Sequence, residues 1–140
     1  MVKLLSKKCE KFVDEYFNSL GKQCVCSRFN DTGDTIQGRG KGVVLRRNPS
    51  DFVITDEGVT FYAEVKSTNS PTGVSSSLFS QQKSRRDRIL KAGGTYVYFI
   101  YSYFLDTWFY ARGEFIQEKG ERKFSELTKH DGLTQRWKNY

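Results

Sequence analysis

The stretch that decides the fold covers residues 48–66 and reads NPSDFVITDEGVTFYAEVK. Two runs within it, 52–55 and 59–65, are rich in β-branched and aromatic residues, which favour β-strands. The connection between them, 56–58, is polar, ends in glycine and has a length that closes a hairpin. Because both runs are strongly apolar, we predict that they form a β-hairpin in the centre of a buried sheet.

Three charged residues lie at one end of this hairpin. Antiparallel pairing brings Asp51, before the first strand, next to Glu64, near the end of the second. Glu64 and Lys66 are two positions apart, so their side chains leave the same face of the strand. A strand cap and an exposed charge pair are the alternative explanations, but lone charges beside a buried hairpin are costly. Two adjacent carboxylates repel each other, and a divalent cation bound by oxygens relieves that repulsion.

The order Pro49-Ser50-Asp51, hairpin, Glu64-Val65-Lys66 resembles the PD-(D/E)XK signature of metal-dependent DNA nucleases. The flanking elements are similar in order to those of RecU-type and archaeal Hjc-type Holliday junction resolvases. Glu10 lies on an amphipathic first helix, and Gln82 lies near the start of a basic helix that ends in two glycines. The resemblance covers residues 5–116. It implies a single α/β domain of restriction-endonuclease-like type, with a mixed central β-sheet flanked by helices, working as a homodimer.

The resemblance also implies roles for individual residues. Asp51, Glu64 and Glu10, with the carbonyl of Val65, would hold one or two Mg²⁺ or Mn²⁺ ions. The metal would activate water and neutralise the charge that grows on the scissile phosphate. Lys66 would orient that water or help to deprotonate it. The predicted catalytic set is Asp51, Glu64, Lys66, Glu10 and Gln82.

Two of these assignments have ordinary alternatives. A first helix is predicted over 3–20, and Glu10 lies there among lysines, where a solvated helical salt bridge would explain it. Asp14, one turn later, is the substitute acid. Gln82 falls in a second helix predicted over 78–92, and an ordinary polar helix position is the alternative reading of it.

The strongly basic composition points to an acidic partner. The 140 residues carry a net charge of +7 and the pI is about 9.4, so nucleic acid is the first candidate and an anionic membrane surface the second. The glycine-rich segment 28–48 predicts a mobile basic arm that contacts phosphates, with a plain solvated loop as the alternative. The predicted DNA-binding residues are Arg28, Arg39, Lys41, Arg46, Arg47, Ser67, Thr68, Lys83, Arg85 and Arg86.

The remaining elements complete one domain over residues 1–140. Strands are predicted at 24–29, 95–101 and 108–111, and the tail 117–140 is expected to form a short helix or a wrapping segment. The aromatic residues of the later strands invite a base-stacking interpretation. Burial in the core or in a dimer interface explains these aromatic residues better, because a strand that is apolar on both faces is buried.

Several classes of protein are disfavoured. No apolar run approaches the length of about 18 residues that spans a bilayer, and no signal peptide is recognisable, so we expect a cytoplasmic protein. Cys9, Cys24 and Cys26 lack zinc-site spacing and are expected to be reduced structural thiols. His130 is expected to be exposed and not catalytic.

The sequence therefore predicts a Mg²⁺-dependent endonuclease that resolves four-way DNA junctions by paired phosphodiester hydrolysis. One alternative is another nuclease of the same fold, of repair, flap or restriction type, which would cut linear duplex. The other is a non-catalytic DNA-binding module, which would bind DNA equally well after loss of Asp51 or Glu64.

Overall fold

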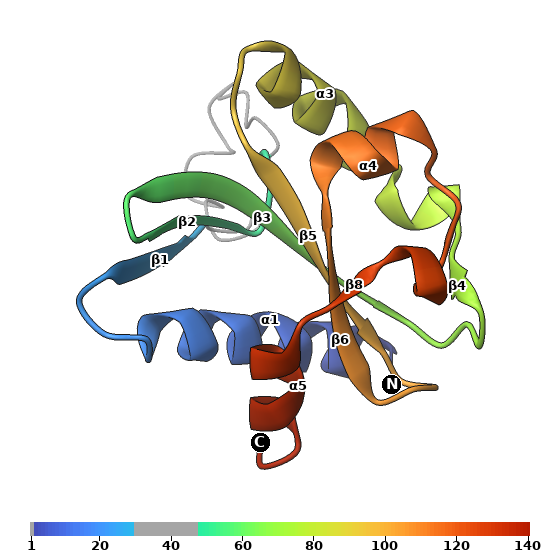
Figure 1. Ribbon diagram of the computed structural model, residues 1–140, viewed down its shortest axis with the longest axis horizontal. Coiled ribbons are helices and arrows are strands. Elements are labelled where there is room, and N and C mark those ends of the chain that lie inside the picture. Colours follow the sequence, from blue (N-terminus) through green and yellow to red (C-terminus); the bar gives the residue numbers. More distant parts are fainter. Residues whose placement is uncertain (1, 30–47) are drawn as a thin grey trace, which may run out of the picture.

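A six-stranded mixed β-sheet forms the centre of the protein (Figure 1). The computed structural model describes residues 2–29 and 48–140. The strands of this sheet are β1 (Cys24–Arg28), β2 (Phe52–Asp56), β3 (Val59–Thr68), β5 (Tyr96–Ser102), β6 (Thr107–Arg112) and β8 (Thr128–Lys129). They lie in the order β1-β2-β3-β5-β6-β8, with β3 and β5 parallel and the other neighbours antiparallel. The predicted hairpin is β2 and β3, and the predicted mixed central sheet is confirmed.

Helices cover both faces of the sheet in a single α/β domain. The helices α1 (Val2–Asn18) and α5 (Asp131–Trp137) pack on one face, and α3 (Lys83–Lys91) and α4 (Gly113–Glu118) pack on the other (Figure 1). The remaining short elements are the 3-10 turns η2 (Ser76–Phe79) and η3 (Phe124–Glu126) and a two-stranded ribbon of β4 (Gly73–Val74) and β7 (Arg122–Lys123). No helix in the described part of the chain is both long and apolar enough to cross a bilayer.

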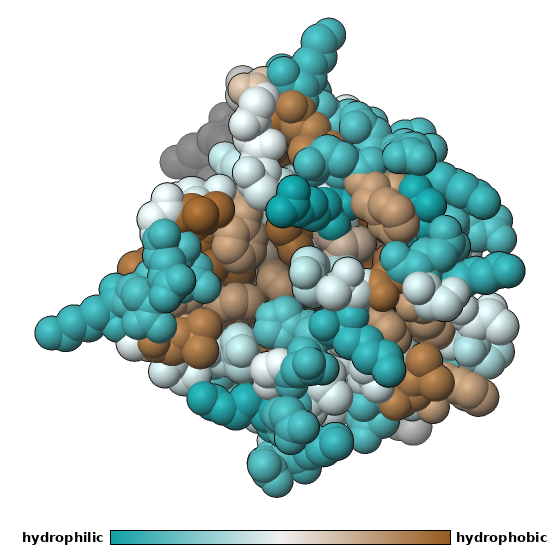
Figure 2. All heavy atoms as spheres, viewed as in Figure 1, coloured by the Kyte–Doolittle hydropathy of each residue, from teal (hydrophilic) through white to brown (hydrophobic). Residues whose placement is uncertain are grey.

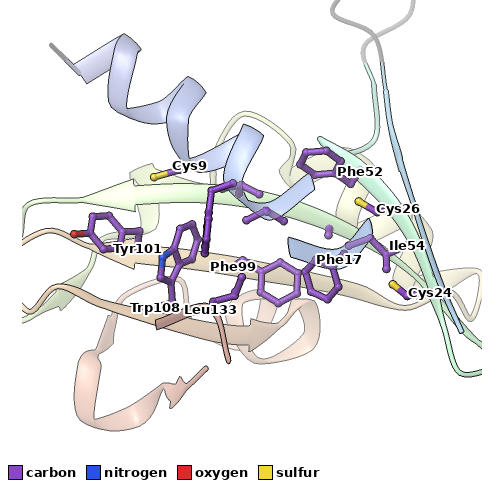
Figure 3. Packing of buried hydrophobic residues seen from close by; sticks show 14 residues of the cluster. Cys9, Phe17, Cys24, Cys26, Phe52, Ile54, Phe99, Tyr101, Trp108 and Leu133 are labelled. Atoms are coloured by element: carbon purple, nitrogen blue, oxygen red, sulfur yellow. The ribbon is translucent and has the colours of Figure 1, made fainter. Parts of the chain in front are cut away.

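One core cluster lies between α1 and the sheet (Figure 3). Phe12 and Phe17 come from the buried face of the amphipathic helix α1. They meet Phe52 and Ile54, the alternate residues of β2 that are fully buried, and Trp108 of β6 packs against Phe12 at a ring-centroid distance of 5.6 Å. Because side chains alternate along a strand, this packing turns position 51 toward the opposite face of the sheet.

A second cluster lies under α3 and α4. Tyr98 and Ile100 of β5 are fully buried there, beside Phe79 and Ile116. Phe99, between them in sequence, packs on the α1 side and is 3% exposed. This strand is therefore buried on both faces, and the prediction that its aromatic residues belong to the core is confirmed.

The second helix begins later than predicted. The sequence predicted a helix over 78–92, but residues 76–79 form η2 and α3 starts at Lys83. The Ser80 hydroxyl donates to the carbonyl of Ser77 at 3.0 Å. Serine side chains compete in this way for backbone groups that an α-helix would use. The regular α-helix therefore does not extend back through this segment.

The tail contributes more to the fold than predicted, because it supplies both the edge strand β8 and the helix α5. The expectation that His130 is exposed is wrong. His130 is half-buried, and its Nδ1 accepts a hydrogen bond from the backbone N–H of Leu133 at 3.0 Å, which caps α5. The three cysteines are buried and free, as predicted.

Candidate functional site

The hairpin brings the first predicted acid against the end of the second strand. Phe52 pairs with Ala63, so the register continued by one residue sets Asp51 beside Glu64. The Oδ2 atom of Asp51 accepts a hydrogen bond from the backbone N–H of Val65 at 2.8 Å. This bond fixes the orientation of the Asp51 carboxylate at the end of the hairpin.

Two further contacts hold the segment that carries Asp51. The Tyr96 hydroxyl donates to the carbonyl of Pro49 at 2.7 Å, and the Ser50 hydroxyl donates to the carbonyl of Phe52 at 2.7 Å. The sequence analysis did not find these supporting roles. The signal was the alternation of β5, which turns Tyr96 toward the same face of the sheet as Asp51.

Glu64 is the most buried member of the candidate site. It is 4% exposed, and its Oε2 atom lies 3.4 Å from Nζ of Lys66. Its other oxygen, Oε1, is buried and receives no hydrogen bond from a donor among the described residues, and a proton on Glu64 would be shared with the neighbouring carboxylate of Asp51. A buried carboxylate oxygen without a donor is costly. The orphaned oxygen beside a second carboxylate fits a hard cation that binds through oxygen ligands.

Electrostatics set the protonation of the two acids together. Burial and, after it, the negative charge of Asp51 raise the pKa of Glu64 to about 8, although the charge of Lys66 opposes the shift. Burial also raises the pKa of Asp51, against the hydrogen bond from Val65. The two carboxylates share one proton equilibrium, so a bound cation would allow both to be charged at neutral pH.

Glu10 is not brought together with these acids. Its Oε1 atom lies 2.8 Å from Nη2 of Arg28, on the α1 side of the sheet, whereas Glu64 faces the α3 side. The positive charge of Arg28 also lowers the pKa of Asp51. Over residues 2–29 and 48–140, no three His, Cys, Asp or Glu side chains are grouped closely enough to share a metal ion.

Gln82 occupies the N-cap position of α3. Its backbone carbonyl accepts a hydrogen bond from the N–H of Arg86 at 2.9 Å. The side-chain Oε1 is buried and, within the described part of the chain, has no hydrogen-bond partner. Like the Oε1 atom of Glu64, this atom is a buried acceptor that receives no hydrogen bond. Among the described residues, Gln82 makes no hydrogen bond to Asp51 or Glu64.

The predicted DNA-binding residues separate into three groups. On α3, Lys83 is exposed and Arg85 half-exposed, and Ser67 and Thr68 are half-buried at the end of β3. Arg28 is engaged by Glu10 as described above. The predicted residues that lie outside the described part of the chain are Arg39, Lys41, Arg46 and Arg47, with the segment 30–47 of the predicted arm.

The placement of Arg86 on the outer, basic face of the helix is wrong. Arg86 is 2% exposed, its Nη1 lies 3.2 Å from the Tyr98 hydroxyl, and its Nε donates to Asp87 at 2.9 Å. Arg86 lies three residues before Ile89 and four before Leu90, which pack against the core, so helical spacing itself turns Arg86 toward the sheet, where it contacts Tyr98 and Asp87.

The fold class of the protein is mixed α/β. Its central β-sheet contains one parallel strand pair, and helices flank both faces. The same fold occurs in the 1.6 Å structure of Hjc, a Holliday junction resolvase from the archaeal hyperthermophile Archaeoglobus fulgidus. The TM-score is 0.57 at 9% sequence identity, and the match covers 93% of this chain and 98% of that chain. No family model matches the sequence, and no curated protein is similar to it. The likeness therefore concerns the fold.

Proposed function

We propose that the protein is a metal-dependent DNA endonuclease of PD-(D/E)XK type that acts on four-way junctions. The observation that carries the proposal is the buried group of Asp51, Glu64 and Lys66, in which one oxygen of Glu64 receives no hydrogen bond from a donor among the described residues. The same three residue types in this order define the signature that the sequence resembles. The fold likeness to a junction resolvase at nearly full coverage of both chains supports the substrate class.

Asp51, Glu64 and the carbonyl of Val65 would hold the metal, with Mg²⁺ as the expected ion. When bound, such an ion supplies positive charge next to the scissile phosphate and lowers the pKa of a bound water. The chain's own residues do the rest. Asp51 is oriented by the N–H of Val65, and Lys66 lies close enough to Glu64 to place its ammonium group beside the reacting phosphate.

Surface charge supports DNA as the partner. The whole chain carries +7, and on α3 the side chains of Lys83, Arg88 and Lys91 are exposed. Phosphate contacts by such residues add affinity without reading sequence. We further propose a homodimer in the cytoplasm, since two copies would set two sites against opposite strands of a junction.

The position of Glu10 favours a second candidate function. With Glu10 bound to Arg28, the described site contains two carboxylates and one lysine. That set is sufficient for hydrolysis of ordinary duplex or flap DNA by a nuclease of the same fold. The two candidates differ in substrate and share the same chemistry.

The experiment compares a labelled four-way junction with a linear duplex of the same arms, with Mg²⁺ and with EDTA. Wild type should nick the junction symmetrically only with Mg²⁺, and Asp51→Asn should be inactive. Glu118→Gln, at a position whose side chain is 80% exposed, is the matched control and should cut like wild type. Equal cutting of the linear duplex would favour the second candidate, and DNA binding without cutting in any divalent metal would overturn both.

A further inference from the structure

A cavity of about 640 Å³ opens at the far end of β3. It lies between the segment that follows β3 and the β4–β7 ribbon, at the right-hand edge of the view in Figure 1, where Figure 2 shows hydrophilic residues beside paler and hydrophobic ones. Five of the eleven lining residues carry a hydroxyl group. The lining residues with polar side chains are Thr68, Ser70, Thr72, Ser75, Ser77, Glu121, Arg122 and Lys123.

Several of these hydroxyl oxygens accept hydrogen bonds within the protein. The Oγ1 atom of Thr68 accepts from the N–H of Ser70 at 3.2 Å, and the Oγ atom of Ser70 accepts from the N–H groups of Thr72 and Gly73 at 3.4 Å. A hydroxyl whose oxygen already accepts still has its proton to donate. The hydroxyls of Ser75 and Ser77 lie 2.9 Å apart, so one donates to the other and one proton remains. The lining therefore suits a ligand rich in hydrogen-bond acceptors.

The cavity begins next to the candidate active site. Glu64, Lys66 and Thr68 alternate along β3 and leave the same face, which carries α3 and α4. Two residues of a strand advance by about 6.6 Å, so Thr68 places the cavity one such step beyond Lys66. A polymer lying along β3 would pass from the carboxylates directly into the cavity.

The charge of the lining residues indicates how much charge the ligand carries. Arg122 is turned away, because its Nη2 donates to the carbonyl of Phe115 at 2.9 Å and its Nη1 lies 3.3 Å from Glu126. The remaining charges on the lining are Lys123 and Glu121, which balance each other. A nearly neutral pocket of hydroxyl donors fits a singly charged phosphodiester with its sugar better than a multiply charged phosphate monoester.

We propose that this pocket holds the phosphodiester and sugar next to the scissile phosphate, on the same DNA strand. The inference rests on the proposed function and adds the path that the strand takes across the protein. The hydroxyls orient this part of the strand, and Lys66 and the two carboxylates then meet the following phosphate. Because Thr68 and Ser70 are fixed by backbone hydrogen bonds, the pocket is formed before DNA arrives.

The test measures DNA binding by Asp51→Asn protein without metal, so that cleavage does not interfere. The probes are a fluorescent four-way junction and a linear duplex, each titrated at several salt concentrations. The pocket variant adds Thr72→Val, Ser75→Ala and Ser77→Ala, which keep the backbone contacts of Thr68 and Ser70. The matched control adds Thr55→Val and Ser125→Ala, which remove hydroxyls from exposed positions elsewhere.

Loss of two hydrogen bonds to the ligand, one from Thr72 and one from the Ser75–Ser77 pair, should weaken binding by about tenfold in the pocket variant. The slope of log affinity against log salt should stay unchanged, because no charge is removed, whereas Lys123→Gln should reduce it by about one. Thermal unfolding checks that the pocket variant retains its fold. Binding by the folded pocket variant within twofold of the parent would overturn the pocket and leave the proposed function standing. Failure of the parent to bind either DNA would overturn both.

Discussion

Replacing Glu64 with glutamine removes a titratable group from a position that is 4% exposed and keeps the shape of the side chain. In the folded protein the pKa of Glu64 is raised to about 8, and in the unfolded chain the group has its ordinary value of 4.5. The folded state therefore holds this proton more tightly. The stabilising contribution is fully present below pH 4.5 and is lost as the pH rises toward 8.

For a single group with these two values, the free energy of unfolding falls by about 3 kcal/mol between pH 5 and pH 8. Glu64→Gln has no such loss. We therefore expect the stability of the variant relative to wild type to increase by about 3 kcal/mol over the same interval. Taking this difference at each pH cancels the titration of groups that do not interact with Glu64, such as His130. Asp51 shares the proton of Glu64, so its response is part of the measured difference.

Urea unfolding of both proteins in EDTA at the two pH values measures the effect. The exposed variant Glu118→Gln should follow wild type at both. Mg²⁺ at pH 8 should stabilise wild type and leave Glu64→Gln unchanged, because the metal requires the carboxylate. A stability difference that stays constant within about 0.5 kcal/mol between pH 5 and pH 8 would refute the argument that burial holds a proton on Glu64.

Three further outcomes follow from contacts around the site. Lys66→Met should slow single-turnover cleavage of a junction by at least about 100-fold with similar DNA affinity in a gel-shift titration, and unchanged cleavage would exclude a role in catalysis. Tyr96→Phe removes the hydrogen bond to Pro49 and should cost about 1 kcal/mol in urea unfolding; no loss would mean that this bond does not hold the Asp51 segment. Burial lowers the pKa of His130, so its contribution to stability is lost as the pH falls below 6.5. In melts from pH 7 to 5, wild type should lose stability relative to His130→Asn, which keeps a cap without titrating, and parallel curves would contradict this.

The local part of the site could be predicted from sequence. Alternation within the hairpin and the polar connection at 56–58 determine that Asp51 and Glu64 meet and that Lys66 leaves the same face. These relations need only the period of a strand and the direction of pairing. The mixed sheet was predicted from the family resemblance.

The long-range part could not be predicted in the same way. Helical periodicity identifies the face of α1 that carries Glu10, but it does not determine that Arg28, 18 residues later, takes its carboxylate. The error at Arg86 came from assigning this residue by its charge, since helical spacing alone puts it on the same face as Ile89 and Leu90, which pack against the core. The strand β8 is two residues long, too short to show any alternation.

The packing of α5 against α1 has a consequence for the order of folding. The rings of Trp137 and Tyr140 each lie 4.9 Å from the ring of Phe12, and Arg136 donates to the Ser19 hydroxyl 117 residues earlier in the chain. During synthesis, α1 is made long before these aromatic residues. The rest of its apolar face packs on the sheet, so only the part around Phe12 stays open until Trp137 has been made. Contacts at this sequence separation form slowly, so this part of the core is expected to close late in folding.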